Sequence, residues 1–279
     1  MSERITQSTF HGLPASRLDA PGGGQATVTD FGAHVVSWSP APGDERLYMS
    51  EQAVFDGTKP LRGGVPVIFP QFGAFASGVR HGFARLLTWN RTEHRSGPDF
   101  STATWTMVST DPAQHVPAVV EMTVCVEAGR LDLELHVAHA GGEAFEFTAA
   151  LHTYLRVPDI TSTTLVGLQN YSYMDQCDGG AVREQTERHL RIDREVDRIY
   201  RDAPGRLDVI SRDFTTRVIQ DGFTDTVVWN PWVERSKAFA DLPAEGFRRF
   251  VCVEAASVLT PVRLEPGEEW AGRQTLAAV

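Results

Sequence analysis

Residues 119–138 read VVEMTVCVEAGRLDLELHVA, and apolar and polar side chains alternate through two runs of this stretch. Val119–Val126 and Leu131–Ala138 are each typical of a β-strand with one buried face. The residues between them, Glu127-Ala128-Gly129-Arg130, include a glycine and form a turn short enough to join antiparallel neighbours. The stretch therefore predicts a β-hairpin.

Further strand-like runs lie on both sides of this hairpin, separated by Gly, Pro and Asp, whereas long helical periodicity is scarce. The charged segment Glu184–Asp197 could form a solvated helix or an exposed strand, and the alternation in HLRIDREVD favours the strand. Many short strands at this spacing predict an all-β sandwich or barrel. The other predicted strands are Thr102–Ser109, Phe145–Val157, Thr226–Trp229, Arg249–Glu254 and Gln274–Val279.

The chain contains no linker, low-complexity tract or internal repeat, so we expect residues 1–279 to form a single domain. The run Gly22-Gly23-Gly24 precedes a strand-like segment, opens no helix and lacks a following Gly-Lys-Ser/Thr. It therefore predicts a turn and not a phosphate-binding loop.

Composition limits the partners. With 42% hydrophobic and 22% charged residues, the chain is typical of a soluble globular protein. Its formal net charge of -10 argues against binding nucleic acid or an anionic membrane, so an anionic ligand would need a local arginine cluster. Cys125, Cys177 and Cys252 are too scattered for a disulfide framework. The N-terminus lacks the apolar core of a signal peptide, and we expect a cytoplasmic monomer with reduced thiols.

Two ionisable residues lie inside apolar strand-like runs, His152 in AALHTYLRVPDI and Glu254 in RRFVCVEAAS. Such residues are costly to bury unless they are paired or functional. Hydrogen bonds to the backbone could satisfy the histidine, and Arg248 or Arg249 could pair with the glutamate. Alternatively, the two supply an acid and a base that work near neutral pH, which suits opening and closing a sugar ring.

Residues 61–85 contain LRGGVPVIFPQFG followed by ASGVRHGFARL, and the glycines and prolines predict an irregular path on which side chains can converge. Arg62, Arg80 and Arg85 are the positive charges of this segment, and His81 lies among them. Guanidinium groups match phosphate oxygens and stay protonated at any working pH. The alternative is that these arginines pair with nearby acids on the surface.

Metal chemistry is not predicted. His136 and His139 are three apart on a predicted strand and so point to opposite faces. The sequence contains no HExxH or similar metal-ligand spacing, and we expect no catalytic metal and no cofactor. It contains no GxSxG motif of a serine hydrolase either.

With these residues the chain resembles the D-hexose-6-phosphate mutarotases (glucose-6-phosphate 1-epimerases), a branch of the aldose 1-epimerase superfamily. The resemblance covers most of the chain in the right order. It rests on LRGGVPVIFPQFG, HGFAR, LHTYLRVPDI, EVDRIY, VVWNPW, FVCVEAASV and RLEPGEEW. The RGG and HGFAR strings favour the phosphate-using branch.

This resemblance implies an all-β fold, a β-supersandwich of large antiparallel sheets of the galactose mutarotase type, with the active site in a cleft on a concave face. It implies that His152 is the general acid and Glu254 the general base. It also implies that Asp197 binds the sugar and that Arg62 and Arg85 contact the substrate.

Two positions are less defined by the resemblance. Arg80 stands where relatives often have Gln, so it could contact phosphate, a sugar hydroxyl or neither. His81 falls at a position near the sugar in the wider superfamily. The expected substrate is a hexose 6-phosphate, with glucose 6-phosphate as first choice, and the sequence does not distinguish it from galactose or mannose 6-phosphate.

Three other functions compete with this interpretation. The protein could be a mutarotase of unphosphorylated aldoses, or a carbohydrate-binding β-sandwich without catalysis. It could also be a glycoside hydrolase that uses Glu254 and Asp197 as its two carboxylates, which would leave His152 without a function. Trp229 and Trp232 in VVWNPW could form a platform for a pyranose or pack in the core.

Overall fold

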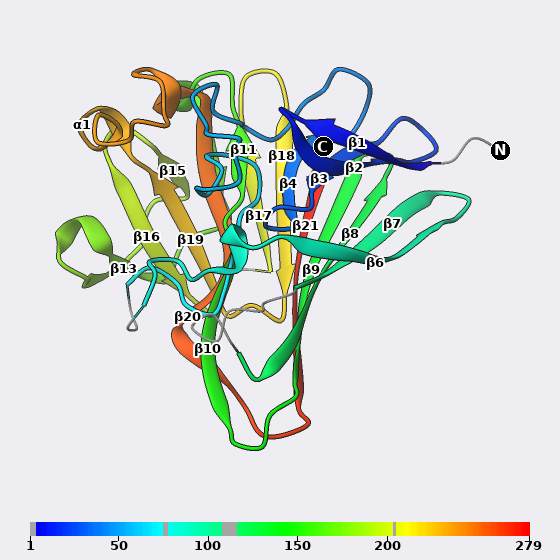
Figure 1. Ribbon diagram of the computed structural model, residues 1–279. Coiled ribbons are helices and arrows are strands. Elements are labelled where there is room, and N and C mark those ends of the chain that lie inside the picture. Colours follow the sequence, from blue (N-terminus) through cyan, green and yellow to red (C-terminus); the bar gives the residue numbers. More distant parts are fainter. Residues whose placement is uncertain (1–3, 75–77, 108–115, 203–204) are drawn as a thin grey trace.

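The structure, a computed structural model, describes residues 4–74, 78–107, 116–202 and 205–279. Its named strands pair in an antiparallel manner and form three sheets (Figure 1). Within the described residues, helical structure comprises α1 (Trp232–Ser236) and short 3₁₀ turns at Ala84–Leu86, Ile160–Ser162, Gln176–Asp178 and Gly246–Arg249. The first sheet contains, in spatial order, β1 (Ile5–Phe10), β2 (Leu13–Asp19), β3 (Gln25–Thr29) and β4 (His34–Ser39).

The two larger sheets carry most of the strands. The eight-stranded sheet has the order β14 (Ala181–Glu184), β13 (Ser172–Asp175), β16 (Val196–Arg201), β19 (Asp225–Asn230), β20 (Phe250–Leu264), β10 (Phe145–Leu151) and β5 (Val67–Ile68), and β11 (Tyr154–Arg156) also pairs with β20. The nine-stranded sheet has the order β15 (His189–Arg191), β12 (Thr164–Val166), β17 (Arg206–Ile210), β18 (Thr215–Asp221), β21 (Glu269–Ala278), β9 (Arg130–His139), β8 (Ala118–Glu127), β7 (Phe100–Met107) and β6 (Trp89–Ser96).

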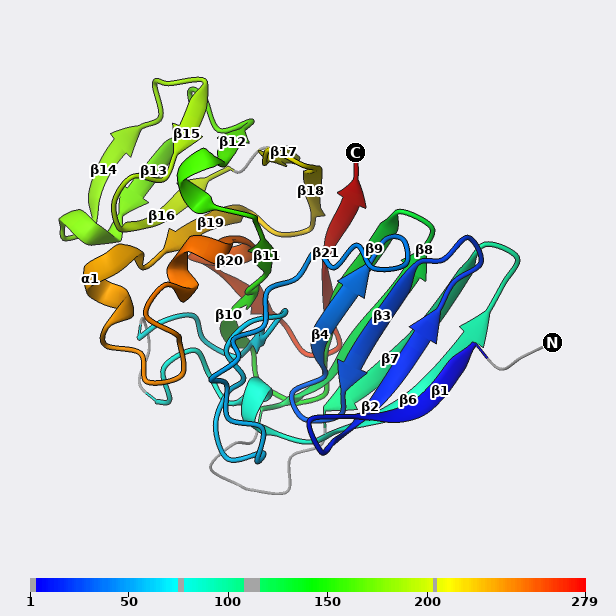
Figure 2. The ribbon, with the colours of Figure 1, turned by 90° about the horizontal axis from the view of Figure 1, so that it is seen from above.

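The sheets pack face to face around a shared core, as predicted for a sandwich. Figure 2 shows the first sheet lying over β6–β9, and β2 and β7 are in contact. The core cluster draws buried side chains from all three sheets, among them Val28, Leu133 and Val253. Among the described residues we find no helix with the length and hydropathy needed to cross a bilayer.

The predicted hairpin is confirmed. Strand β8 ends at Glu127 and β9 begins at Arg130, so Ala128 and Gly129 form the turn. Gly129 has a φ of 73°, a conformation that glycine adopts without a steric penalty. Burial alternates from one residue to the next along both strands because one face packs on the core. The Gly22–Gly24 run is likewise part of a turn.

Two strand predictions are wrong in detail. The run Phe145–Val157 is not one strand, because β10 ends at Leu151 and β11 begins only at Tyr154. The segment Glu184–Asp197 is extended as predicted, but it is divided among the end of β14, all of β15 and the start of β16. Of the predicted strand Thr102–Ser109, residues 108 and 109 lie outside the described residues.

The RGGVP segment runs beside the break between β10 and β11. The backbone N–H groups of His152 and Tyr154 donate to the carbonyl oxygens of Pro66 (3.0 Å) and Gly64 (2.9 Å). Gly64 has a φ of 60°, and a Cβ atom there would lie 2.3 Å from the carbonyl oxygen of Val35. The close approach of three backbone segments therefore requires glycine at this position.

Candidate active site

Strands β10 and β11 hold the same register on β20, on either side of a two-residue break. Leu151 pairs with Ala255, and Tyr154 pairs with Cys252. In that register His152 lies across from Glu254. The N–H of Thr153 donates back to the carbonyl oxygen of Leu151 at 3.0 Å, which closes a tight turn at the break.

The imidazole and the carboxylate are in direct contact. His152 Nε2 lies 3.3 Å from Glu254 Oε1, and the side chains are 11% and 1% exposed. Their other polar atoms, His152 Nδ1 and Glu254 Oε2, are buried without a hydrogen-bond partner among the described residues. The alternative pairing of Glu254 with Arg248 is wrong, because Arg248 bonds to Asp159 at 2.7 Å.

Burial shifts the pKa values of this pair in opposite directions. It lowers the pKa of His152 well below 6.5, and the positive charges of Arg85 and Arg62 lower it further. It raises the pKa of Glu254 well above 4.5, and the negative charge of Asp197 adds to this. Both shifts favour the uncharged forms, a neutral imidazole and a protonated carboxyl, in which the pair holds one proton between two groups.

Aromatic rings enclose the histidine. The ring of Tyr154 stacks on His152 at 4.9 Å between centroids, and Trp229 packs edge-on at 5.9 Å. Trp229 is half-buried and forms a wall of this site, whereas Trp232 packs against the core. The stacking holds the imidazole in one orientation toward Glu254.

Asp197 lies in the same sheet as Glu254. It is opposite Trp229, which in turn is opposite Cys252, so the residues form a row across β16, β19 and β20. Burial raises the pKa of Asp197 to about 6, while the charge of Arg80 opposes this shift. The structure thus brings Asp197 to the edge of the His152–Glu254 pair.

Arg62 is held by two partners. It donates to the hydroxyl of Tyr154 at 3.1 Å and pairs with the carboxylate of Asp241 at 3.2 Å. Its guanidinium also lies over the ring of Phe239. Neither Tyr154 nor Asp241 was predicted as a site residue, since nothing near them in sequence signals a contact with residue 62.

Unlike Arg62, Arg85 and Arg80 have no carboxylate partner among the described residues. Arg85 donates to the carbonyl oxygen of Arg80 at 2.8 Å, its Nε has no partner among the described residues, and burial together with Arg62 and Arg80 lowers its pKa to about 10. Arg80 is exposed, but its charge acts on His81 and Asp197. These arginines create a positive field beside the proton-sharing pair.

His81 lies between the arginines and His152. Its Nδ1 accepts from the N–H of Gly73 at 3.2 Å, so Nε2 carries the proton of the neutral ring. Burial, followed by the charges of Arg85, Arg80 and Arg62, lowers its pKa to about 3. Its ring centroid is 5.8 Å from that of His152, and His81 is therefore a neutral hydrogen-bond donor at the site.

A buried amide, which no sequence pattern indicated, connects the chain neighbours of both ionisable residues. The hydroxyl of Thr153 donates to Gln274 Oε1, and Gln274 Nε2 donates to the carbonyl oxygen of Val253 at 3.1 Å. Thr153 follows His152, and Val253 precedes Glu254. Gln274, on β21 of the opposite sheet, therefore fixes the two backbones relative to each other.

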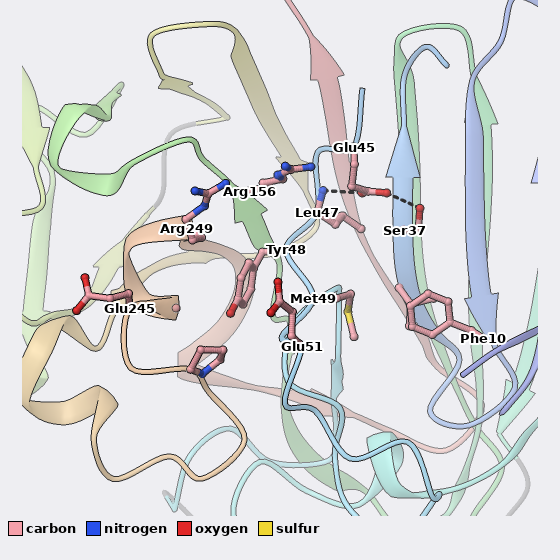
Figure 3. Close-up of a pocket in the computed structure, with 13 residues that line it drawn as sticks. Phe10, Ser37, Glu45, Leu47, Tyr48, Met49, Glu51, Arg156, Glu245 and Arg249 are labelled. Atoms are coloured by element: carbon pink, nitrogen blue, oxygen red, sulfur yellow. Dashed lines mark hydrogen bonds between the residues drawn. The ribbon is translucent and has the colours of Figure 1, made fainter. Parts of the chain in front are cut away.

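A separate cavity lies elsewhere in the protein. It has a volume of about 600 Å³ and is lined by Phe10, Glu45, Tyr48, Met49, Arg156 and Arg249, among others (Figure 3). Tyr48 stacks on Phe250 at 5.0 Å, and Phe250 packs on Tyr154. Aromatic rings thus separate this cavity from the His152–Glu254 pair.

The sequence pattern of the family described as aldose 1-epimerase matches residues 14–277. The protein therefore belongs to the aldose 1-epimerase family, and the family supports an epimerase (mutarotase) activity. A protein of Cenchrus ciliaris named "Putative glucose-6-phosphate 1-epimerase" is 32% identical over 267 residues, which cover 91% of this chain and 81% of that protein.

Solved structures confirm the predicted fold. The crystal structure of a "putative mutarotase" from Salmonella typhimurium has a TM-score of 0.91 and 26% identity, covering 100% of this chain and 95% of that one. A "galactose mutarotase-like protein" from Clostridium acetobutylicum has a TM-score of 0.77 at 14% identity, covering 99% and 98%. The architecture is therefore the galactose mutarotase-like sandwich of large antiparallel sheets.

The Gln274 contact is tested by Thr153→Val, which removes the hydroxyl but keeps the shape. We expect the free energy of unfolding to fall by about 1–3 kcal/mol, because a buried amide oxygen loses its donor. Thr153→Ser should restore most of the loss in chemical denaturation. Thr92→Val, at an exposed hydroxyl contact with Thr106, should change stability by less than about 0.5 kcal/mol. Equal effects at both positions would contradict the assignment.

Proposed function

We propose that this protein interconverts the α and β anomers of a hexose 6-phosphate, glucose 6-phosphate being the first candidate. The observation that carries the proposal is the buried contact of 3.3 Å between His152 Nε2 and Glu254 Oε1, with the charges of Arg62 and Arg85 acting on the imidazole. Ring opening needs an acid at the ring oxygen and a base at the C1 hydroxyl. Since both oxygens are bonded to C1, the acid and the base must lie within a few ångströms of each other.

In the proposed reaction Glu254 accepts the proton of the C1 hydroxyl while His152 donates one to the ring oxygen, and the bond between C1 and that oxygen breaks. The aldehyde rotates about the C1–C2 bond and presents its other face. Ring closure reverses both transfers. The pair holds one proton throughout, which satisfies the reversibility of the reaction without a net change of charge.

A bound phosphate would favour the protonated imidazole that ring opening requires. For ring opening His152 must be protonated, yet the charges of Arg85 and Arg62 disfavour the imidazolium. A phosphate monoester carries about -1.5 to -2 charges at pH 7. Bound to these arginines, it would offset their field, raise the pKa of His152 and shift the proton from Glu254 to the imidazole.

The second candidate is a mutarotase of unphosphorylated aldoses. It is favoured by one observation, the engagement of Arg62 with Asp241 and Tyr154, which gives that arginine a structural role without any anion. The two candidates differ in how the rate depends on the 6-phosphate, so anomer exchange measured on glucose and on glucose 6-phosphate separates them.

Replacing His152 or Glu254 by a residue that cannot ionise tests their proposed catalytic roles. We expect His152→Ala and Glu254→Gln to lower kcat by about 10²–10⁴-fold each, because each group transfers a proton in both half-reactions. Binding of the sugar should change far less. The measurement is anomer-resolved NMR exchange above the spontaneous rate, with Cys177→Ser, an exposed thiol, as control. A wild-type rate of anomer exchange in either variant would refute the proposed role of that residue.

Removing a positive charge tests the substrate class. For Arg85→Leu we expect KM for glucose 6-phosphate to rise about 10–100-fold, since a hydrogen bond to a charged group contributes about 1.5–3 kcal/mol. Turnover of free glucose should not fall, because it loses no phosphate contact and the imidazolium of His152 becomes less unfavourable. Arg17→Leu, at an exposed arginine paired with Asp19, is the matched control. An equal loss on both sugars would argue for the unphosphorylated substrate.

The pH dependence of kcat follows from the shared proton. Activity should fall in acid when His152 gains a second proton, below pH 6.5, and in alkali when Glu254 loses its proton, well above pH 4.5. Arg85→Leu should move the acid limb to higher pH, because the imidazolium becomes less unfavourable. Asp197→Asn should move the alkaline limb to lower pH. Limbs that stay fixed in both variants would refute this assignment.

A further inference from the structure

Cys252 lies next to His152 and Glu254, the proton-sharing pair. It precedes Glu254 by two positions on β20, so both side chains point to the same face of the sheet. The sulfur of Cys252 and the nearest ligand atoms of His152 and Glu254 all lie within 4.8 Å of one another, and all three residues are buried. Glu254 Oε2 and His152 Nδ1 are buried without hydrogen-bond partners among the described residues.

The separations are close to those of a metal site. With zinc bonded at about 2.0–2.3 Å to nitrogen, oxygen and sulfur, tetrahedral ligands lie roughly 3.4–3.6 Å apart. The nitrogen and the oxygen are already 3.3 Å apart. The sulfur needs to approach by up to about 1.4 Å, which a rotation of the Cys252 side chain can supply.

The charges also fit a divalent cation. Once the metal has displaced their protons, the Cys252 thiolate and the Glu254 carboxylate carry two negative charges together, and the imidazole is a neutral ligand. The carboxylate of Asp197 adds a negative field at both Cys252 and Glu254. The positive charges of Arg85 and Arg62 oppose the cation, although Arg62 is paired with Asp241.

The donor set selects the metal. Sulfur and imidazole nitrogen favour Zn²⁺ and similar cations, whereas Mg²⁺ and Ca²⁺ prefer oxygen ligands. Three protein ligands in a tetrahedron leave a fourth position for water.

We propose that His152, Cys252 and Glu254 form an inhibitory site for Zn²⁺ or a related thiophilic divalent cation. The bound cation occupies the imidazole lone pair and the carboxylate that the sugar reaction needs, so metal and sugar exclude each other. The cation takes no part in the reaction. Binding of the metal is independent of the proposed function, and only its inhibitory effect rests on that function.

Cobalt provides a readout that does not depend on activity, because a thiolate bound to Co²⁺ gives a charge-transfer band in the near ultraviolet. Titration of the wild-type protein with CoCl₂ should produce this band. In Cys252→Ser and Cys252→Ala the band should be lost and Zn²⁺ affinity, measured by calorimetry, should fall at least about 100-fold, more than the loss of an outer-shell partner causes. Cys177→Ser should behave as wild type, and circular dichroism verifies the fold of each variant.

Inhibition is then measured by NMR anomer exchange with and without ZnCl₂. The apparent inhibition constant should rise in proportion to the sugar concentration in wild type, and Zn²⁺ should lose its effect in the Cys252 variants. A wild-type protein without the cobalt band, or a band that persists without Cys252, overturns the metal site. A cobalt band in a protein that exchanges no anomers retains the metal site and refutes the proposed function.

Discussion

The site depends on the common register that β10 and β11 keep on β20. This register sets His152 opposite Glu254. Within the two-residue break the N–H of His152 donates to the carbonyl oxygen of Pro66, and that of Thr153 donates back to Leu151. Gln274 then bridges the chain neighbours of both side chains from the opposite sheet. Backbone hydrogen bonds from His152 to Pro66 and from Val253 to Thr153 hold the two segments in place, so the distance between the two ionisable groups is set by the backbone and not by their own attraction.

The second constraint is the close passage of residues 62–66 beside that break. Because Gly64 has no side chain, this segment can approach closely enough for the carbonyl oxygens of Pro66 and Gly64 to accept from the N–H groups of His152 and Tyr154. The same passage brings Arg62 within reach of Tyr154. The same irregular segment thus bonds to the backbone of His152, the proposed acid, and places the positive charge of Arg62 near its ring. It does so in a protein with a formal net charge of -10.

Local patterns predicted the fold better than the site. Alternation in residues 119–138 was enough for the hairpin, because each strand has one buried face. The continuous apolar run from Phe145 hid the break at residue 152, since periodicity describes burial and the break is caused by backbone bonds to a segment about 90 residues away. For the same reason the partners of Arg62 and the amide of Gln274 could not be predicted: each contact joins residues with no relation in sequence.

Burial of the pair explains how a reaction with no net proton uptake can be controlled electrostatically. In water a histidine and a glutamate would ionise independently. Solvent would screen the charge of a nearby anion, so the anion would have little effect on either pKa. In the buried site the position of the single proton depends on the surrounding charges, with Arg62 and Arg85 on one side and Asp197 on the other. A ligand that changes the charge at the arginines therefore changes which group holds the proton. In the proposed reaction, a phosphate bound at these arginines would therefore be coupled to proton transfer at C1 through the electric field.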